Sequence, residues 1–82
     1  MPQDDLVESR ELREVLRCER GKETRTYNLR SVPGGAELWR VTEIHGEPVS
    51  TVKECVLRTP EETAEFLEEV RRTLRAGGWE EI

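Results

Sequence analysis

The stretch TPEETAEFLEEVRRTLRAGG, residues 59–78, carries the signals for both ends of one helix. Thr59 is a favoured N-cap residue, and Pro60 suits the first helical position because the N–H that it lacks would have no partner there. Glu62 lies three residues after the cap, at the spacing that completes a capping box. The pattern therefore predicts a helix that begins at Pro60.

The end of this helix is marked just as clearly. Gly77 can adopt the left-handed conformation that terminates helices, so the helix is expected over 60–76 and a tail over 77–82. The apolar residues of the helix recur at helical spacing and form one stripe, which is typical of a helix with one buried face. This stripe consists of Phe66, Leu67, Val70 and Leu74.

Two turn signals interrupt the chain before this helix. The first is VPGG at 32–35, which fits a type II turn, and the second is HGEP at 45–48. They separate three runs that have the composition of strands, namely residues 24–31, 36–44 and 49–58. Because the turns are short, the runs are expected to pair as an antiparallel meander over 23–58.

Both faces of this sheet are expected to carry apolar side chains. In the second run, Trp39 and Val41 fall on one face, whereas Leu38 and Ile44 fall on the other. The third run divides in the same way, with Val52 and Val56 opposite Val49, Cys55 and Leu57. The helix can cover one face, so the N-terminal segment, a second copy of the protein or a ligand must cover the other.

The N-terminal segment fits two structures. Asp5 resembles a helix cap, Gly21 can stop a helix, and three apolar residues between them lie at helical spacing, which favours a helix over 5–20. These apolar residues are Leu12, Val15 and Leu16. Alternatively, residues 15–20 and the Thr-rich run form a hairpin around Gly21, which gives a shorter helix and a fourth strand.

The expected fold class is thus α+β, with an N-terminal helix, a three- (or four-) stranded antiparallel meander and a C-terminal helix packed on one sheet face. Residues 1–82 are short enough to form a single small domain with one core of marginal stability. Charged residues make up 38% of the chain and apolar residues 34%, with a net charge of −5. Glu and Arg dominate the charged residues, a composition compatible with the ion-pair networks of heat-adapted proteins.

No signal in the sequence points to a membrane or to secretion. The chain does not open on a basic segment followed by an apolar run, and it contains no apolar stretch of the roughly 20 residues that span a bilayer. Cys18 and Cys55 lie far apart, without the spacing of a disulfide framework. A cytoplasmic location and no contact with membranes are therefore expected.

Catalytic, metal and cofactor motifs are not found either. His45 is the only histidine, and its place beside Gly46 is typical of a solvated turn. Cys18 and Cys55 have no histidine or second cysteine at ligand spacing. The glycine pairs are explained by a turn and a helix end rather than by a phosphate loop. We expect no enzyme, no metal and no cofactor.

One binding hypothesis concerns single-stranded nucleic acid. The strand segment contains basic and aromatic residues of the types that stack bases and neutralise phosphates, namely Arg25, Tyr27, Arg30, Trp39 and Arg40. Its element order resembles that of the Whirly-type and transcriptional-coactivator single-stranded-DNA-binding domains, although no motif matches residue by residue. The acidic chain favours instead that these arginines pair with glutamates across the strands and that Trp39 lies in the core.

The favoured hypothesis is a non-enzymatic interaction or regulatory domain that acts through protein–protein association. Apolar groups on both sheet faces would be covered in a homodimer or by another protein. Trp79 lies in the tail and is a candidate interface residue, since Trp is a frequent anchor of interfaces. Equally, Trp79 can fold back over the end of the helix, in the contact that accompanies a glycine cap.

Overall fold

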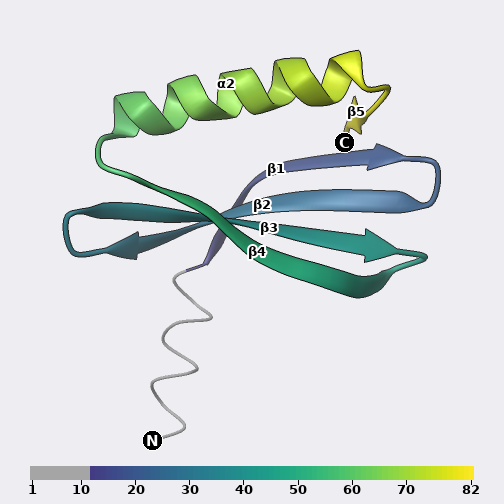
Figure 1. Cartoon of the computed structure of the whole chain (residues 1–82), viewed down its shortest axis with the longest axis horizontal. Coiled ribbons are helices and arrows are strands. Elements are labelled where there is room, and N and C mark those ends of the chain that lie inside the picture. Colours follow the sequence, from purple (N-terminus) through teal and green to yellow (C-terminus); the bar gives the residue numbers. More distant parts are fainter. Residues whose placement is uncertain (1–11) are drawn as a thin grey trace, which may run out of the picture.

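A computed structural model describes residues 12–82, which form a twisted antiparallel sheet of five strands and one helix (Figure 1). The elements, in chain order, are β1 (Arg13–Arg20), β2 (Glu23–Val32), β3 (Gly35–Ile44), β4 (Glu47–Leu57), α2 (Pro60–Ala76) and β5 (Glu80–Glu81). The strand order is β4-β3-β2-β1-β5. Consecutive hairpins therefore build the first four strands, and α2 carries the chain back from β4 at one edge to β1 at the other.

The predicted helix over 5–20 is wrong, because Arg13–Arg20 is strand β1; the part over 5–11 lies outside the described residues. Leu16 and Cys18 are buried, whereas Arg17 and Glu19 are exposed, which is the alternation of a half-buried strand. The register with β2 shifts between Glu14 and Leu16. This irregularity allows adjacent apolar residues within a strand and explains why the segment also fits a helical spacing.

The two predicted turns are present, with one shift in position. The second turn is centred on His45 and Gly46, which both have positive φ angles of 54° and 81°, so β4 begins at Glu47. This geometry is that of a two-residue hairpin turn whose twist matches the flanking strands. After the first turn, Gly35 lies so close to β4 that a Cβ atom there would collide with the backbone oxygen of Leu57. Gly35 thus permits the close approach of β3 and β4.

Irregular pairing between β3 and β4 places one valine of β4 on a different face from the one predicted. Leu38 pairs with Cys55, but Arg40 pairs with Val52, so the register shifts after Leu38. As a result, Val52 lies on the same face as Cys55, and Val56 lies on the opposite face. The expectation that the two valines share a face is therefore wrong, because a bulge cannot be recognised from strict alternation.

The start of α2 agrees with its sequence signals. Thr59 Oγ1 accepts a hydrogen bond of 3.1 Å from the backbone N–H of Glu62. In return, Glu62 Oε1 accepts one of 2.7 Å from the backbone N–H of Arg58, the residue before the cap. The capping interactions therefore extend into the end of β4 and fix the angle at which the chain enters the helix.

The left-handed residue after α2 lies one position later than predicted. Gly77 has an ordinary φ of −89°, and the left-handed residue is Gly78, with a φ of 88°. Gly78 donates its N–H to the oxygen of Arg75 at 3.1 Å, and Trp79 donates to Leu74 at 2.9 Å. This pair of bonds is a Schellman motif, in which the residue after the glycine packs against the helix.

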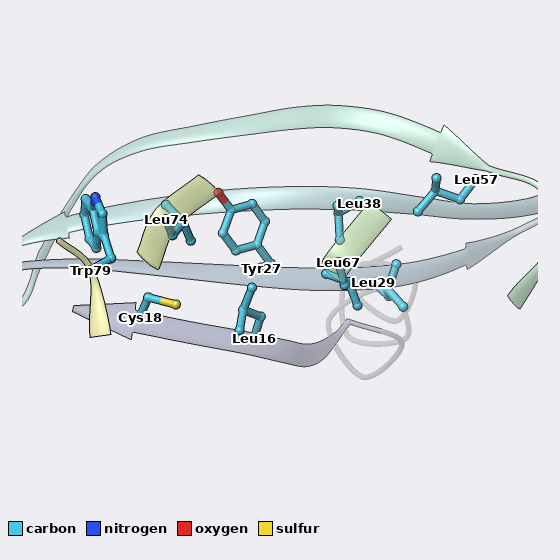
Figure 2. Packing of buried hydrophobic residues seen from close by; sticks show 9 residues of the cluster. All are labelled: Leu16, Cys18, Tyr27, Leu29, Leu38, Leu57, Leu67, Leu74 and Trp79. Carbon is cyan, nitrogen blue, oxygen red and sulfur yellow. The ribbon is translucent and has the colours of Figure 1, made fainter. Parts of the chain in front are cut away.

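The core lies between α2 and one face of the sheet. Among residues 12–82, its buried apolar side chains are Leu16, Cys18, Tyr27, Leu29, Leu38, Leu57, Leu67, Leu74 and Trp79. Figure 2 shows these side chains in a row that runs from Trp79 at one end to Leu57 at the other. Leu38 is fully buried. A single row of side chains covers only part of the sheet, so strands form much of the molecular surface.

Candidate functional site

The two long edges of the sheet are covered to different extents. At the β1 edge, β5 pairs with Cys18 and Glu19, and the N–H of Ile82 donates to the oxygen of Arg17 at 2.9 Å. At the opposite edge, β4 has no neighbouring strand among the described residues. In Figure 1, β4 is the lowest strand on the right, with no coloured element below it. No strand among residues 12–82 therefore satisfies the outer backbone groups of β4.

The side chains of β4 are exposed on both faces. Every residue from Glu47 to Glu54 is exposed, and three valines contribute apolar surface. The exposed fractions are 57% for Val49, 37% for Val52 and 52% for Val56. A strand of 11 residues that is exposed along most of its length is unusual, because edges in natural proteins are usually short, charged or covered. We call the segment Glu47–Glu54 the bare edge.

The face of the sheet opposite α2 carries a cluster around Glu37. The indole N–H of Trp39 donates to Glu37 Oε1 at 3.0 Å, while Arg30 and Lys53 contact the same carboxylate at 3.7 and 3.5 Å. The Trp39 hydrogen bond, followed by the charges of Lys53 and Arg30, lowers the pKa of Glu37 below its usual value. Glu37 therefore engages both cations of this cluster within the chain.

The structure divides the predicted nucleic-acid residues between the two faces. Arg30 and Trp39 lie on the face opposite α2, which we call the open face because no helix or strand among the described residues covers it. Tyr27 and Arg40 pair across β2 and β3 on the face beneath α2, and Arg25 shares that face. Tyr27 is only 4% exposed, so its ring packs in the core and is not available to stack on a base. The five residues do not form one platform.

Two further arginines form ion pairs with glutamates on neighbouring strands. Arg40 Nη1 lies 3.3 Å from Glu54 Oε1, and Arg20 Nη2 lies 3.5 Å from Glu23 Oε1. Both pairs are partly exposed, so each contributes little to stability but reduces the positive potential that a phosphate would meet. Cross-strand pairing with glutamate is thus found for Arg20, Arg30 and Arg40, whereas the expected pairing of Arg25 is not found among residues 12–82.

Trp79 lies inside its own chain. Its side chain is 5% exposed, and the guanidinium carbons of Arg20 and Arg25 lie over its ring, 4.8 and 4.7 Å from the centroid. Arg20 also donates to the oxygen of Gly77 at 3.1 Å. These contacts join the end of α2 to strands β1 and β2. The indole therefore closes one end of the core rather than extending toward a partner.

The candidates for catalytic or metal chemistry are separated. His45 is exposed at the β3–β4 turn, Cys18 is buried on β1, and Cys55 is half-buried on β4. Burial, with smaller contributions from Glu81 and Glu54 respectively, raises the pKa of the Cys18 and Cys55 thiols. Within residues 12–82, no group of histidine, cysteine and acidic side chains is placed to hold a metal ion.

The sequence interpretation did not identify the bare edge. The available signal was topological, because a meander of hairpins places its first and last strands at the edges, and the helix after β4 leads the chain away. The local sequence does not indicate where the helix and β5 pack. In the structure they cover the β1 edge. Which edge stays bare is decided by contacts between residues far apart in the chain.

Two further findings complete the description. Over the part of the chain that the structure describes, α2 is too short and too polar to cross a bilayer. Comparisons with models of protein families, with curated proteins and with solved structures found no match.

Proposed function

We propose that this domain acts through protein–protein association, as a homodimer in which the bare edges of two copies pair antiparallel. The observation that carries this proposal is the exposure of the whole segment Glu47–Glu54, whose outer backbone groups have no neighbouring strand among residues 12–82. Pairing of two such edges satisfies these groups and joins the two sheets into one. The small core of each copy gains apolar contacts in the process.

The charges on β4 favour one register. A two-fold axis through Val52 places Val52 opposite its copy and Thr51 opposite Lys53 on either side. A shift that centres the pairing on Lys53 or on Glu54 brings identical charges face to face, which is destabilising. Because the axis is perpendicular to the sheet, both copies of α2 lie on the same side of the joined sheet.

Sedimentation equilibrium over a range of concentrations tests this proposal. The wild-type chain is expected to show a monomer–dimer equilibrium, and Val52→Lys is expected to raise the dimer dissociation constant at least tenfold, since it places two ammonium groups opposite each other. Ile44→Lys is the matched control, because Ile44 is similarly exposed (41% against 37%) but lies on β3. A monomeric wild type, or equal effects of the two substitutions, would contradict the proposal.

Binding of single-stranded nucleic acid is the alternative. Arg30 and Trp39 share the open face and support it, but Glu37 engages both side chains, and Tyr27 is buried. Fluorescence anisotropy of labelled single-stranded DNA and RNA at low and moderate salt distinguishes the two functions. Salt-sensitive binding that is lost in Arg30→Ala but retained in Val52→Lys would favour the alternative.

A further inference from the structure

A groove of about 370 Å³ lies between α2 and the sheet, on the side of the helix away from β1. Its floor comes from β2 and β3, and its wall comes from the last three turns of the helix. The lining residues are Arg25, Tyr27, Arg40, Phe66, Glu69, Val70, Thr73 and Leu74. This volume is within the range of small-molecule sites. The groove shares no lining residue with the bare edge, although Glu54 of that edge pairs with Arg40 in the groove.

The floor of the groove holds two arginines whose hydrogen-bonding capacity is not filled. The Nε atoms of Arg25 and Arg40 are buried, and neither has a hydrogen-bond partner. A buried polar atom without a partner is costly, and such atoms in native proteins call for an explanation. Both atoms belong to arginines that lie on adjacent strands and line the same groove.

The charges around the two arginines are unequal. Arg40 is paired with Glu54 through its Nη1 atom, which leaves the Nε side of its guanidinium free of that contact. Arg25 makes no ion pair with any carboxylate among residues 12–82; its guanidinium instead lies over Trp79 and close enough to Tyr27 to affect that hydroxyl. Within the described part of the chain, the charge of Arg25 is therefore not paired with a carboxylate, and its stacking on Trp79 positions the guanidinium.

The opposite wall of the groove is apolar. Phe66 and Val70 are half-buried against the core, and Leu74 is buried. Glu69 is exposed at the rim and opposes the approach of a second negative charge. A ligand that fits these walls has a single negative charge at one end and an apolar body at the other.

We propose that this groove binds a small carboxylic acid with an apolar body, whose carboxylate is held between Arg25 and Arg40. Guanidinium groups hold carboxylates through paired, charge-assisted hydrogen bonds, and the guanidinium groups of Arg25 and Arg40 line this groove from neighbouring strands. The apolar body then packs on Phe66 and Val70. Thr73 and Tyr27 supply hydroxyl groups at the same site.

Nuclear magnetic resonance of the full chain tests this proposal, because arginine Nε–H groups give their own signals. The probes are 4-phenylbutyrate, its neutral amide and inorganic phosphate. Phenylbutyrate is expected to shift the signals of Arg25 and Arg40 in a saturable manner at millimolar concentration, and the amide and phosphate are expected to cause at least tenfold weaker responses. Equal responses to the acid and the amide would overturn the role of the charge.

Substitutions locate the site. Arg25→Gln and Arg40→Gln are each expected to weaken phenylbutyrate binding at least tenfold, whereas Arg30→Gln on the opposite face is expected to leave it unchanged. Arg25 also stacks on Trp79, so its substitution affects the core as well as the groove. If Arg25→Gln does not fold, Arg40→Gln tests the groove on its own. The proposal is overturned by an absence of saturable shifts in the wild type, by phosphate that binds as tightly as the acid, or by an equal loss of binding in Arg30→Gln.

Discussion

The two edges of the sheet are built from similar hairpins but have different surroundings. At the β1 edge, Leu16 and Cys18 are buried under α2 and β5, and Trp79 closes the end of the core. At the β4 edge, Glu47–Glu54 is exposed on both faces. The difference arises after β4, because the helix carries the chain across the sheet and the C-terminal residues pair with β1.

This asymmetry separates two properties of the domain. Near the β1 edge, Leu16, Cys18 and Trp79 are all part of the buried core, so substitutions there are expected to affect folding. Side chains on the bare edge contribute little to folding and are free to take part in association. Substitutions at the two edges are therefore expected to affect different measurements, and this expectation can be tested residue by residue.

The largest expected effect comes from the two tryptophans of the chain. Trp79→Ala removes a buried ring that is 5% exposed, and it is expected to lower the free energy of unfolding by about 3–5 kcal/mol. Trp39→Ala, on the half-exposed open face, is expected to cost clearly less. Urea denaturation of both variants measures the difference. Equal losses would show that the two faces contribute equally to stability.

The two adjacent glycines at the helix end allow a sharper comparison of the effects of substitution on stability. Gly78→Ala forces a Cβ onto a residue with a φ of 88° and is expected to destabilise by about 1–2 kcal/mol. Gly77→Ala has an ordinary φ of −89°, and a Cβ there would meet its nearest neighbour at 3.5 Å, so an effect near zero is expected. Thermal and urea unfolding check both. A larger effect at Gly77 would contradict the assignment of the cap.

The open face is expected to show a specific acid dependence. Since the folded-state pKa of Glu37 is lowered, chiefly by the Trp39 hydrogen bond, its contribution to stability is present above the usual glutamate value of 4.5 and is lost as the pH falls through the folded pKa. Trp39→Phe should reduce this dependence, and Glu37→Gln should remove it. Unfolding free energies measured across the acid range test the assignment, which fails if both variants keep the wild-type pH profile.

The smallest effect concerns the two thiols. Cys55 is half-buried next to the bare edge, and Cys18 is buried beneath the β1 edge, so iodoacetamide is expected to modify Cys55 first. Burial raises the pKa of both thiols, which makes both reactions slow at neutral pH and faster as the pH rises. Mass spectrometry of a time course identifies the order. Preferential labelling of Cys18 would contradict the difference between the edges.

The sequence predicts those parts of the fold that depend on neighbouring residues. The helix from Pro60 and the two turns follow from caps, Pro and Gly, whose effects act within a few residues. Residues 13–20 were assigned wrongly as helix because the bulge after Glu14 gives their apolar residues a spacing that a helix also shows. A bulge likewise moved Val52 to the other face. Both errors come from pairing partners that are distant in sequence.

The candidate site was less accessible to sequence reasoning. The residue types of Arg25, Tyr27 and Arg40 indicate binding. Their position beneath α2, however, depends on where the helix crosses the sheet. Similarly, the position of Trp79 in the sequence fits both a contact at the helix cap and a residue of an interface. Its contacts with Arg20 and Arg25 decide between the two. Residue types predict the kind of interaction, whereas the face and the partner depend on tertiary packing.

Disulfide cross-linking of Val52→Cys, in a Cys55→Ser background, tests the central claim most directly. In the proposed dimer, position 52 lies opposite its own copy, at the Cα separation of about 4.5–5.5 Å found in antiparallel pairs, which a disulfide can bridge. Rapid formation of a covalent dimer is expected for Val52→Cys, with little cross-linking for an Ile44→Cys control. Absence of the covalent dimer, or equal cross-linking of the control, would contradict association through the bare edge.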